Sequence, residues 1–170
     1  MIKQKPRLSI PTYGFNSLIY DSQHEAEVSI ALKDSVKYLG GNSYSKQIAM
    51  NGYLVTRPAN KHYRKISCID KKGIVFKTIP DFELIDRADV FIEAKGNLDK
   101  RSRRCIDGLL KLGYTIGVVF VSKRAADSAI FPGADVSKAQ WLRSRCVPFV
   151  TEAAKAPLLI PQLLALSEVL

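Results

Sequence analysis

The sequence predicts an α/β domain in which a mixed β-sheet is flanked by α-helices. Segments with the apolar spacing of helices alternate along the chain with short runs rich in Val, Ile and Phe. The clearest of these runs, Tyr114 to Ser122, contains Val118-Val119-Phe120-Val121 and is expected to be a central strand. A length of 170 residues fits a single domain with a sizeable core.

A long amphipathic helix is expected near the N-terminus, followed by three strands. Residues 22–39 have helical spacing, and Gly40-Gly41 would end the helix. Runs of β-branched and aromatic residues bounded by turn residues predict strands at 53–57, 66–69 and 74–79. The turn Asp70-Lys71-Lys72-Gly73 joins the last two strands into a predicted hairpin.

In the second half of the chain, strands and helices alternate. Val90 to Lys95 is predicted to be a strand that Gly96 stops, and Leu98 to Leu112 has helical spacing. The remaining predicted elements are a helix at 137–145, a strand at 147–150 and a last helix at 161–170. Pro161 then lies in the first helical turn, where proline is tolerated. Residues 151–170 are therefore expected to form a C-terminal helical extension of the domain.

The chain carries a strong excess of positive charge. It has 26 Lys and Arg against 16 Asp and Glu, a net charge of +10. This excess favours binding to a polyanion. Nucleic acid is the first candidate, and an anionic membrane surface is the second. Residues 1–20 look irregular and are expected to form a basic arm through Lys3, Lys5 and Arg7. A basic protein that binds no polyanion is the alternative.

Several classes of protein are disfavoured by what the sequence contains. Cys68, Cys105 and Cys146 are widely spaced and odd in number, which favours a reduced, cytoplasmic compartment over a disulfide framework or a metal cluster. No apolar run is long enough to span a membrane. A glycine-rich phosphate loop is not found, so no nucleotide cofactor is expected.

The chemically informative residues are Pro80-Asp81 and Glu93-Ala94-Lys95. Because side chains alternate along a strand, Glu93 and Lys95 share one face. Burying a carboxylate and an amine on an otherwise apolar strand is costly unless both find partners. Asp81 directly follows a predicted strand and could approach Glu93 across the sheet. Two clustered carboxylates repel each other, and a hard cation such as Mg²⁺ would relieve that repulsion.

This group of residues matches the needs of phosphodiester hydrolysis. A metal ion held by Asp81 and Glu93 would polarise the phosphate and lower the pKa of an attacking water. Lys95 could orient that water or offset the charge that develops on the phosphorus centre. The alternative is a surface hairpin on which Glu93 and Lys95 form an exposed ion pair.

The predicted first helix offers two further acidic residues, Glu25 and Glu27. Its apolar stripe is formed by Val28, Leu32, Val36 and Leu39. Glu25 lies about 25° from the mean direction of that stripe and Glu27 about 135° from it, at 100° per residue. Glu25 is therefore the candidate site residue, although Ser22-Gln23-His24-Glu25 also fits a capping box.

A basic helix follows Lys95. Solvent exposure is the ordinary interpretation of its charges, but beside a phosphodiesterase site, phosphate contact is favoured. The candidate DNA-binding residues on this helix and after the next strand are Lys100, Arg101, Arg104, Lys123 and Arg124. Arg104 is expected to face water together with Lys100 and Lys111.

The motif resembles that of the PD-(D/E)xK nuclease superfamily, and the layout resembles the bacteriophage endonuclease I family of junction-resolving enzymes. The resemblance covers residues 22–150. The pieces that match in order are Glu25 with Val28 and Leu32, Pro80-Asp81-Phe82, Glu93-Ala94-Lys95-Gly96, and Ala139-Gln140-Trp141-Leu142 leading to Val147-Pro148-Phe149. The gap between Asp81 and Glu93 is longer than expected for that family, and residues from Thr151 onward have no counterpart.

The resemblance implies a restriction-endonuclease-like fold and an Mg²⁺-dependent endonuclease that cuts branched DNA, such as four-way junctions, to leave 5′-phosphates. Asp81, Glu93 and the Ala94 carbonyl would ligate Mg²⁺, for which Mn²⁺ could substitute. Lys95 would serve the water or the phosphate, and Glu25 would complete the site. An intertwined homodimer in the cytoplasm of a bacterium or of a phage-infected cell is also implied.

Two rival hypotheses stay open. A sequence-specific homing or restriction enzyme of the same superfamily would use the same catalytic residues. A non-catalytic DNA-binding protein on a nuclease-like fold would use the basic surface and keep the carboxylates as structural ion pairs.

Overall fold

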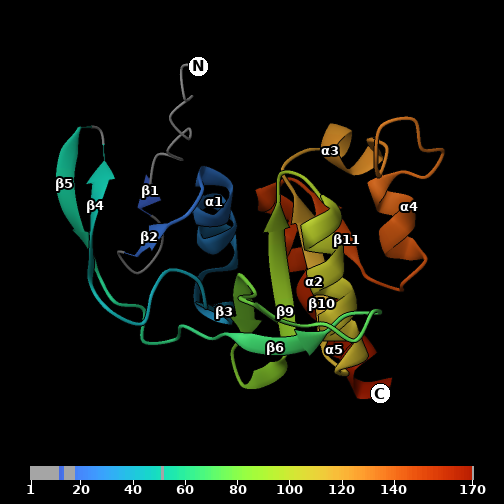
Figure 1. Cartoon of the computed structure of the whole chain (residues 1–170), viewed down its shortest axis with the longest axis horizontal. Helices are drawn as coiled ribbons and strands as arrows, with labels where there is room; N and C mark the ends of the chain where they lie inside the picture. The colour runs from blue at the N-terminus through green and yellow to red at the C-terminus, as the bar shows by residue number, and fades with distance from the viewer. Residues whose placement is uncertain (1–11, 14–17, 51, 170) are drawn as a thin grey trace.

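The computed structural model describes residues 12–13, 18–50 and 52–169 (Figure 1). The predicted basic arm with Lys3, Lys5 and Arg7 lies outside these ranges. What is described of residues 1–20 includes a short antiparallel pair, β1 (Thr12–Tyr13) with β2 (Ile19–Tyr20). The expectation of an irregular segment is therefore wrong at these two strands.

The centre of the molecule is a mixed five-stranded sheet, as predicted. Its order is β11-β10-β9-β8-β3. The bounds of these strands are β3 Val36–Tyr38, β8 Phe82–Leu84, β9 Arg87–Lys95, β10 Thr115–Phe120 and β11 Phe149–Thr151. Strands β9, β10 and β11 are parallel, whereas β8 runs antiparallel to both β9 and β3. All six residues of β10 are buried, which confirms the prediction of a central strand.

Helices cover both faces of this sheet (Figure 1). One face packs against α1 (Gln23–Leu32), η3 (Ala153–Leu158) and α5 (Leu159–Val169). The opposite face packs against α2 (Lys100–Lys111), α3 (Lys123–Asp127) and α4 (Lys138–Arg143). The alternation of side chains along β9 divides its residues between the two cores. In the described part of the chain, no helix is long and apolar enough to cross a membrane.

Two hairpins stand apart from the central sheet. β6 (Ile66–Ile69) and β7 (Val75–Thr78) form the predicted hairpin, but they pair only with each other and pack on the α2 side. β4 (Lys46–Met50) and β5 (Tyr53–Arg57) form a second hairpin, shown at the left edge of Figure 1. The sequence analysis predicts β5 but not β4.

The predicted helix over 22–39 is wrong in its second half. α1 ends at Leu32, a short 3-10 turn, η2 (Lys33–Ser35), follows, and the chain then enters β3. Lys33 adopts a positive φ of 49° and donates its N–H to the Ser29 carbonyl, which ends the helix. Val36 is buried as the apolar stripe predicts, but on a strand, where a β-branched residue packs well.

Candidate active site

The end of β9 and the start of β8 bring the predicted site residues together. Phe82, the first residue of β8, pairs with Ile92 of β9, so Asp81 lies beside the last residues of β9. The Leu39 N–H donates to the Asp81 carbonyl at 2.8 Å and fixes the backbone there. The strand next to Glu93 is thus β8, which begins after Asp81. The expectation that the strand before Asp81 provides this approach is wrong, because β7 pairs only with β6.

Lys95 links the two carboxylates. Its Nζ lies 2.9 Å from Oε2 of Glu93 and 3.9 Å from Oδ2 of Asp81. The same Asp81 oxygen accepts a hydrogen bond from the Ala94 N–H at 2.8 Å. Glu93 is only 4% exposed, so the Glu93–Lys95 pair is not the exposed surface ion pair of the alternative interpretation.

The electrostatic state of this group follows from its burial. Burial, followed by the charge of Glu93, raises the pKa of Asp81 well above its ordinary value. Burial alone would lower the pKa of Lys95, but the nearby carboxylates of Glu93 and Asp81 outweigh it and raise that pKa. Lys95 is therefore a cation at neutral pH, and one ammonium does not fully relieve the repulsion between the carboxylates.

Glu25 approaches the same group from the first turn of α1. Its backbone N–H donates to the N-cap Ser22 hydroxyl at 3.1 Å, and Tyr38 donates its hydroxyl to Oε2 of Glu25 at 3.0 Å. Burial, followed by the charge of Asp21, raises the pKa of Glu25. Glu25 is half-buried while Glu27 is exposed, as the helix geometry predicts.

Tyr38 and its neighbours are contacts that the sequence does not predict. The Tyr38 hydroxyl also lies 3.4 Å from Oδ2 of Asp21, and Asp21 pairs with Arg57 at 2.6 Å. Arg57, at the end of β5, donates two further hydrogen bonds to the Ile19 carbonyl. Tyr38 belongs to the segment predicted to be helical, and its contact with Glu25 exists only because that segment is a strand.

The donor set of this site fits a hard divalent cation. Asp81 and Glu93 offer carboxylate oxygens, and the Ala94 carbonyl points to the same strand edge as its N–H, toward Asp81. Within the described ranges, no three His, Cys, Asp or Glu side chains gather closely enough to hold one metal ion. Mg²⁺ is commonly held by one or two carboxylates and completes its shell with water, so two suffice. With all groups ionised, Glu25, Asp81, Glu93 and Lys95 carry a net charge of −2, which a divalent ion would neutralise.

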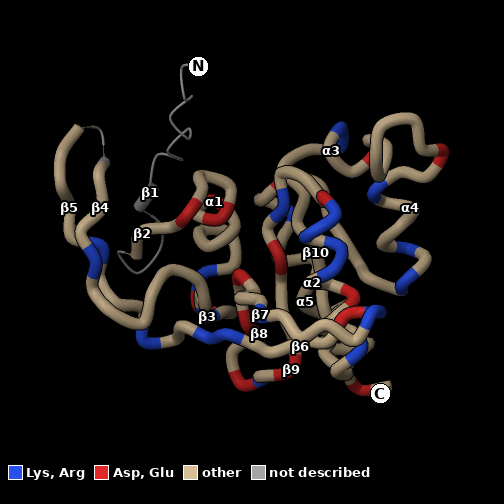
Figure 2. The backbone as a smooth tube through the Cα atoms, viewed as in Figure 1, with Lys and Arg blue, Asp and Glu red and all other residues tan. Residues whose placement is uncertain are grey.

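The predicted DNA-binding residues lie on or near α2 and α3, where Lys and Arg positions gather along the backbone (Figure 2), and they divide into two groups. Lys100, Arg101, Lys123 and Arg124 are exposed near the end of the sheet that carries Lys95, where the Val121 N–H donates to the Lys95 carbonyl. Arg104 differs, because it pairs with Asp70 at 2.9 Å and stacks 4.0 Å from the Phe76 ring centroid. Arg104 therefore faces water only in part: its side chain is 39% exposed, and it also holds the β6–β7 hairpin against α2.

Two comparisons with known proteins identify no relative of this chain. A scan against models of known protein families finds no match to the chain. A search of curated proteins finds no significant match either.

Proposed function

We propose that this protein is a divalent-metal-dependent endonuclease that cleaves branched DNA, such as four-way junctions, and leaves 5′-phosphates. The observation that carries the proposal is the convergence of Asp81, Glu93 and Lys95 at the end of one strand pair, where Glu93 is buried, Asp81 and Lys95 are half-buried, and carboxylate charge is in excess. The mixed sheet with helices on both faces supports a restriction-endonuclease-like fold for this site.

The residues divide the chemistry among them. Asp81, Glu93 and the Ala94 carbonyl would hold Mg²⁺ or Mn²⁺, which when bound supplies Lewis-acid polarisation and a more acidic water. The raised pKa of Lys95 keeps it protonated, so it cannot take a proton from water. Its ammonium is suited to stabilise negative charge on the phosphate instead. Glu25, whose pKa is raised, is placed to accept a hydrogen bond from water at this site.

The substrate class is proposed from the sequence resemblance and from charge. A net charge of +10 suits a DNA partner, and a homodimer would place one site on each of two strands of a junction. The cytoplasm of a bacterium or of a phage-infected cell is the proposed compartment.

Cleavage of an end-labelled four-way junction, with Mg²⁺ or with EDTA, tests this function. We expect cleavage only with Mg²⁺ or Mn²⁺, and a loss of at least 100-fold in the Asp81→Ala, Glu93→Ala and Lys95→Ala variants, typical of lost charge-stabilising groups. Junction binding should persist in all three. Glu25→Gln should lose activity, whereas the matched Glu27→Gln should not. Full activity of Glu93→Ala would overturn the proposal.

The same assay separates the two rivals. Preference for a linear duplex over a junction that contains the same sequence would favour a sequence-specific enzyme. Junction binding without cleavage under any divalent ion, and without a Mg²⁺-dependent shift in melting temperature, would favour a non-catalytic DNA-binding protein.

A further inference from the structure

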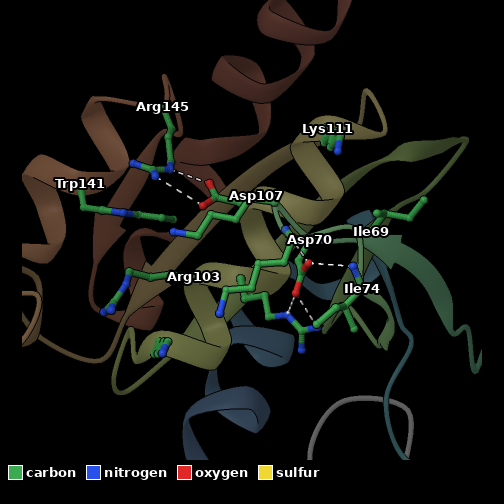
Figure 3. Close-up of a pocket in the computed structure, with 12 residues that line it drawn as sticks. Ile69, Asp70, Ile74, Arg103, Asp107, Lys111, Trp141 and Arg145 are labelled. Carbon is green, nitrogen blue, oxygen red and sulfur yellow. Dashed lines mark hydrogen bonds and ion pairs between the residues drawn. The ribbon is translucent and has the colours of Figure 1, made fainter.

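A groove of about 880 Å³ lies between α2, α4 and the tip of the β6–β7 hairpin (Figure 3). It is separate from the candidate active site and includes only two of the predicted DNA-binding residues, Lys100 and Arg104. Seven Lys and Arg residues and two Asp residues line it, which gives its walls a net charge of +5. Such a concentration of one sign in a concave surface attracts polyanions.

Part of this positive charge is already committed to the fold. Asp70 pairs with Arg104 at 2.9 Å, and Asp107 pairs with Arg145 at 2.6 Å. Arg103 donates to two backbone carbonyls. Four lysines line the groove: Lys71, Lys72, Lys100 and Lys111. Within the described residues, none of them forms an ion pair. These four ammonium groups are free to contact a ligand.

The hairpin tip is held in a fixed position on α2. The Asp70 carboxylate accepts the backbone N–H groups of Lys72 at 2.9 Å and Ile74 at 3.0 Å, so it shapes the turn as well as pairing with Arg104 (Figure 3). Gly108 allows the hairpin to lie directly on the helix, because a Cβ there would fall 2.8 Å from the Phe76 ring and 2.9 Å from Cβ of Cys68. Lys71 and Lys72, at the tip of the hairpin, therefore belong to a turn with a well-defined position on α2.

The groove and the candidate active site share one side of the sheet. Glu93 and Lys95 alternate onto the same face as Phe91, whose side chain packs in the core under α2. Lys100, five residues after Lys95, marks one end of the helix and Lys111 the other, roughly 16 Å away at 1.5 Å per residue. Along the axis of a DNA duplex, where each strand advances by one phosphate per ~3.4 Å, that length covers about five base-pair steps.

We propose that this groove binds the phosphate backbone of a DNA duplex arm that leads away from the cleavage site. This inference rests on the proposed function. Lysine side chains contact phosphates without reading sequence. No Asn or Gln, which read adenine edges, lines the groove. The groove therefore adds affinity for a duplex arm of any sequence.

Salt-dependent DNA binding tests the proposal. Fluorescence anisotropy would measure binding of a labelled junction, and of one duplex arm alone, to full-length protein with Glu93→Gln, which prevents cleavage. Adding Lys71→Ala and Lys72→Ala should weaken binding at least tenfold at 150 mM salt. It should also reduce the slope of log K against log salt by about 1.8, since each lost phosphate contact contributes about 0.9.

The matched control is Lys61→Ala with Lys155→Ala, two exposed lysines outside the groove. It removes the same charge and should change the affinity less than twofold. A second groove variant, Lys100→Ala with Lys111→Ala, checks the α2 wall. Equal weakening by groove and control variants would show a general charge effect and overturn the proposal, as would groove variants that bind DNA like the parent.

Failure of the groove can be told apart from failure of the nuclease. If the wild-type protein cleaves junctions but the groove variants bind normally, only the groove proposal fails. If no cleavage occurs but the groove variants still lose DNA affinity, the groove stands and the nuclease fails. Groove-dependent binding to vesicles containing phosphatidylserine, without groove-dependent DNA binding, would identify a membrane surface instead and overturn the proposal.

Discussion

Asp81 is the residue at which the fold and the proposed function conflict most directly. Its folded-state pKa lies above the unfolded value of about 3.9, so folding disfavours its ionised form. Its contribution to stability is thus fully present below that unfolded value and is lost as pH rises through the folded pKa. The carboxylate that would hold a metal ion is one that destabilises the protein when no metal is bound.

We expect Asp81→Asn to be more stable than the wild type at pH 7 in EDTA. The amide oxygen can still accept the Ala94 N–H, and a gain of about 1 kcal/mol would raise Tm by roughly 2–4 °C in a domain of this size. Thermal melts should show the difference disappear below about pH 3.9, where Asp is neutral in both states. Added Mg²⁺ should raise the wild-type Tm more than that of the variant. A less stable variant at pH 7 would contradict this account.

Tyr38 is predicted to be a positioning residue for Glu25. Tyr38→Phe removes the hydroxyl that donates to Glu25 but keeps the ring, whose centroid lies 4.5 Å from that of Tyr20. A hydrogen bond to a charged group contributes about 1.5–3 kcal/mol, so Mg²⁺-dependent cleavage should slow at least tenfold. DNA binding should not change.

The pH profile distinguishes positioning from a structural role for Tyr38. The lost hydrogen bond lowers the pKa of Glu25 in the wild type, so in Tyr38→Phe the acid limb of the rate profile should move to higher pH. Tyr44→Phe is the control, because Tyr44 is 61% exposed. An unshifted profile with a lower Tm would assign Tyr38 to the core alone.

At the level of elements, the segment from Thr151 onward has no counterpart in the family that the sequence resembles. Its helix α5 forms one layer of the domain, packed on the central sheet. Leu159 and Leu163 of α5 are fully buried against the sheet. A Cβ added at Gly117 of β10 would lie 3.0 Å from Leu163, so the glycine lets α5 approach the strand closely. The helix covers the apolar face of β9 and β10 opposite the candidate groove.

Leu163→Ala should therefore destabilise the whole domain. Removing a fully buried leucine costs about 2–5 kcal/mol, which combines lost burial with the cavity that remains. Chemical denaturation should show that loss in the free energy of unfolding. Leu158→Ala, at a position 59% exposed, is the control and should cost little. Equal, small effects at both positions would mean that α5 does not belong to the cooperative core.

Other elements show where the local sequence was sufficient to predict the secondary structure and where it was not. The β6–β7 hairpin was predictable because its turn and its β-branched residues act locally. The end of α1 was not predictable, because Val36 and Leu39 continue the helical spacing. The pairing of β3 with β8 decides that this segment is a strand. Tertiary pairing overrode a periodicity that is equally compatible with a helix.

At the scale of the whole molecule, the β4–β5 hairpin pairs with no other described strand, and Arg57 at its end ties it to Asp21 and to the Ile19 carbonyl. Neither described core cluster includes any of its residues, and Tyr53 and Leu54 are 77% and 79% exposed. An isolated two-stranded hairpin is only marginally stable in water. This supports the proposed homodimer, in which a second chain would cover the hairpin.

We expect light scattering to give twice the monomer mass of 18.9 kDa at micromolar concentration. Leu54→Lys should shift the protein toward the monomer, because it puts a charge into the buried contact. Leu158→Lys, at a position of η3 that is 59% exposed and outside the hairpin, is the control. A wild-type protein that stays monomeric at every concentration would rule out the dimer and leave the single-chain site unaffected.

By itself, the sequence determined the α/β class and the placement of Glu93 and Lys95 on one face of a strand, because strand alternation and apolar spacing are local properties. It also placed Glu25 inward, since helix geometry over one turn suffices. Only the tertiary structure decided the approach of Asp81 through β8, the contact of Tyr38 with Glu25, and the groove of lysines from the hairpin and α2. These features join residues distant along the chain, and their positions depend on which strands pair and which faces pack.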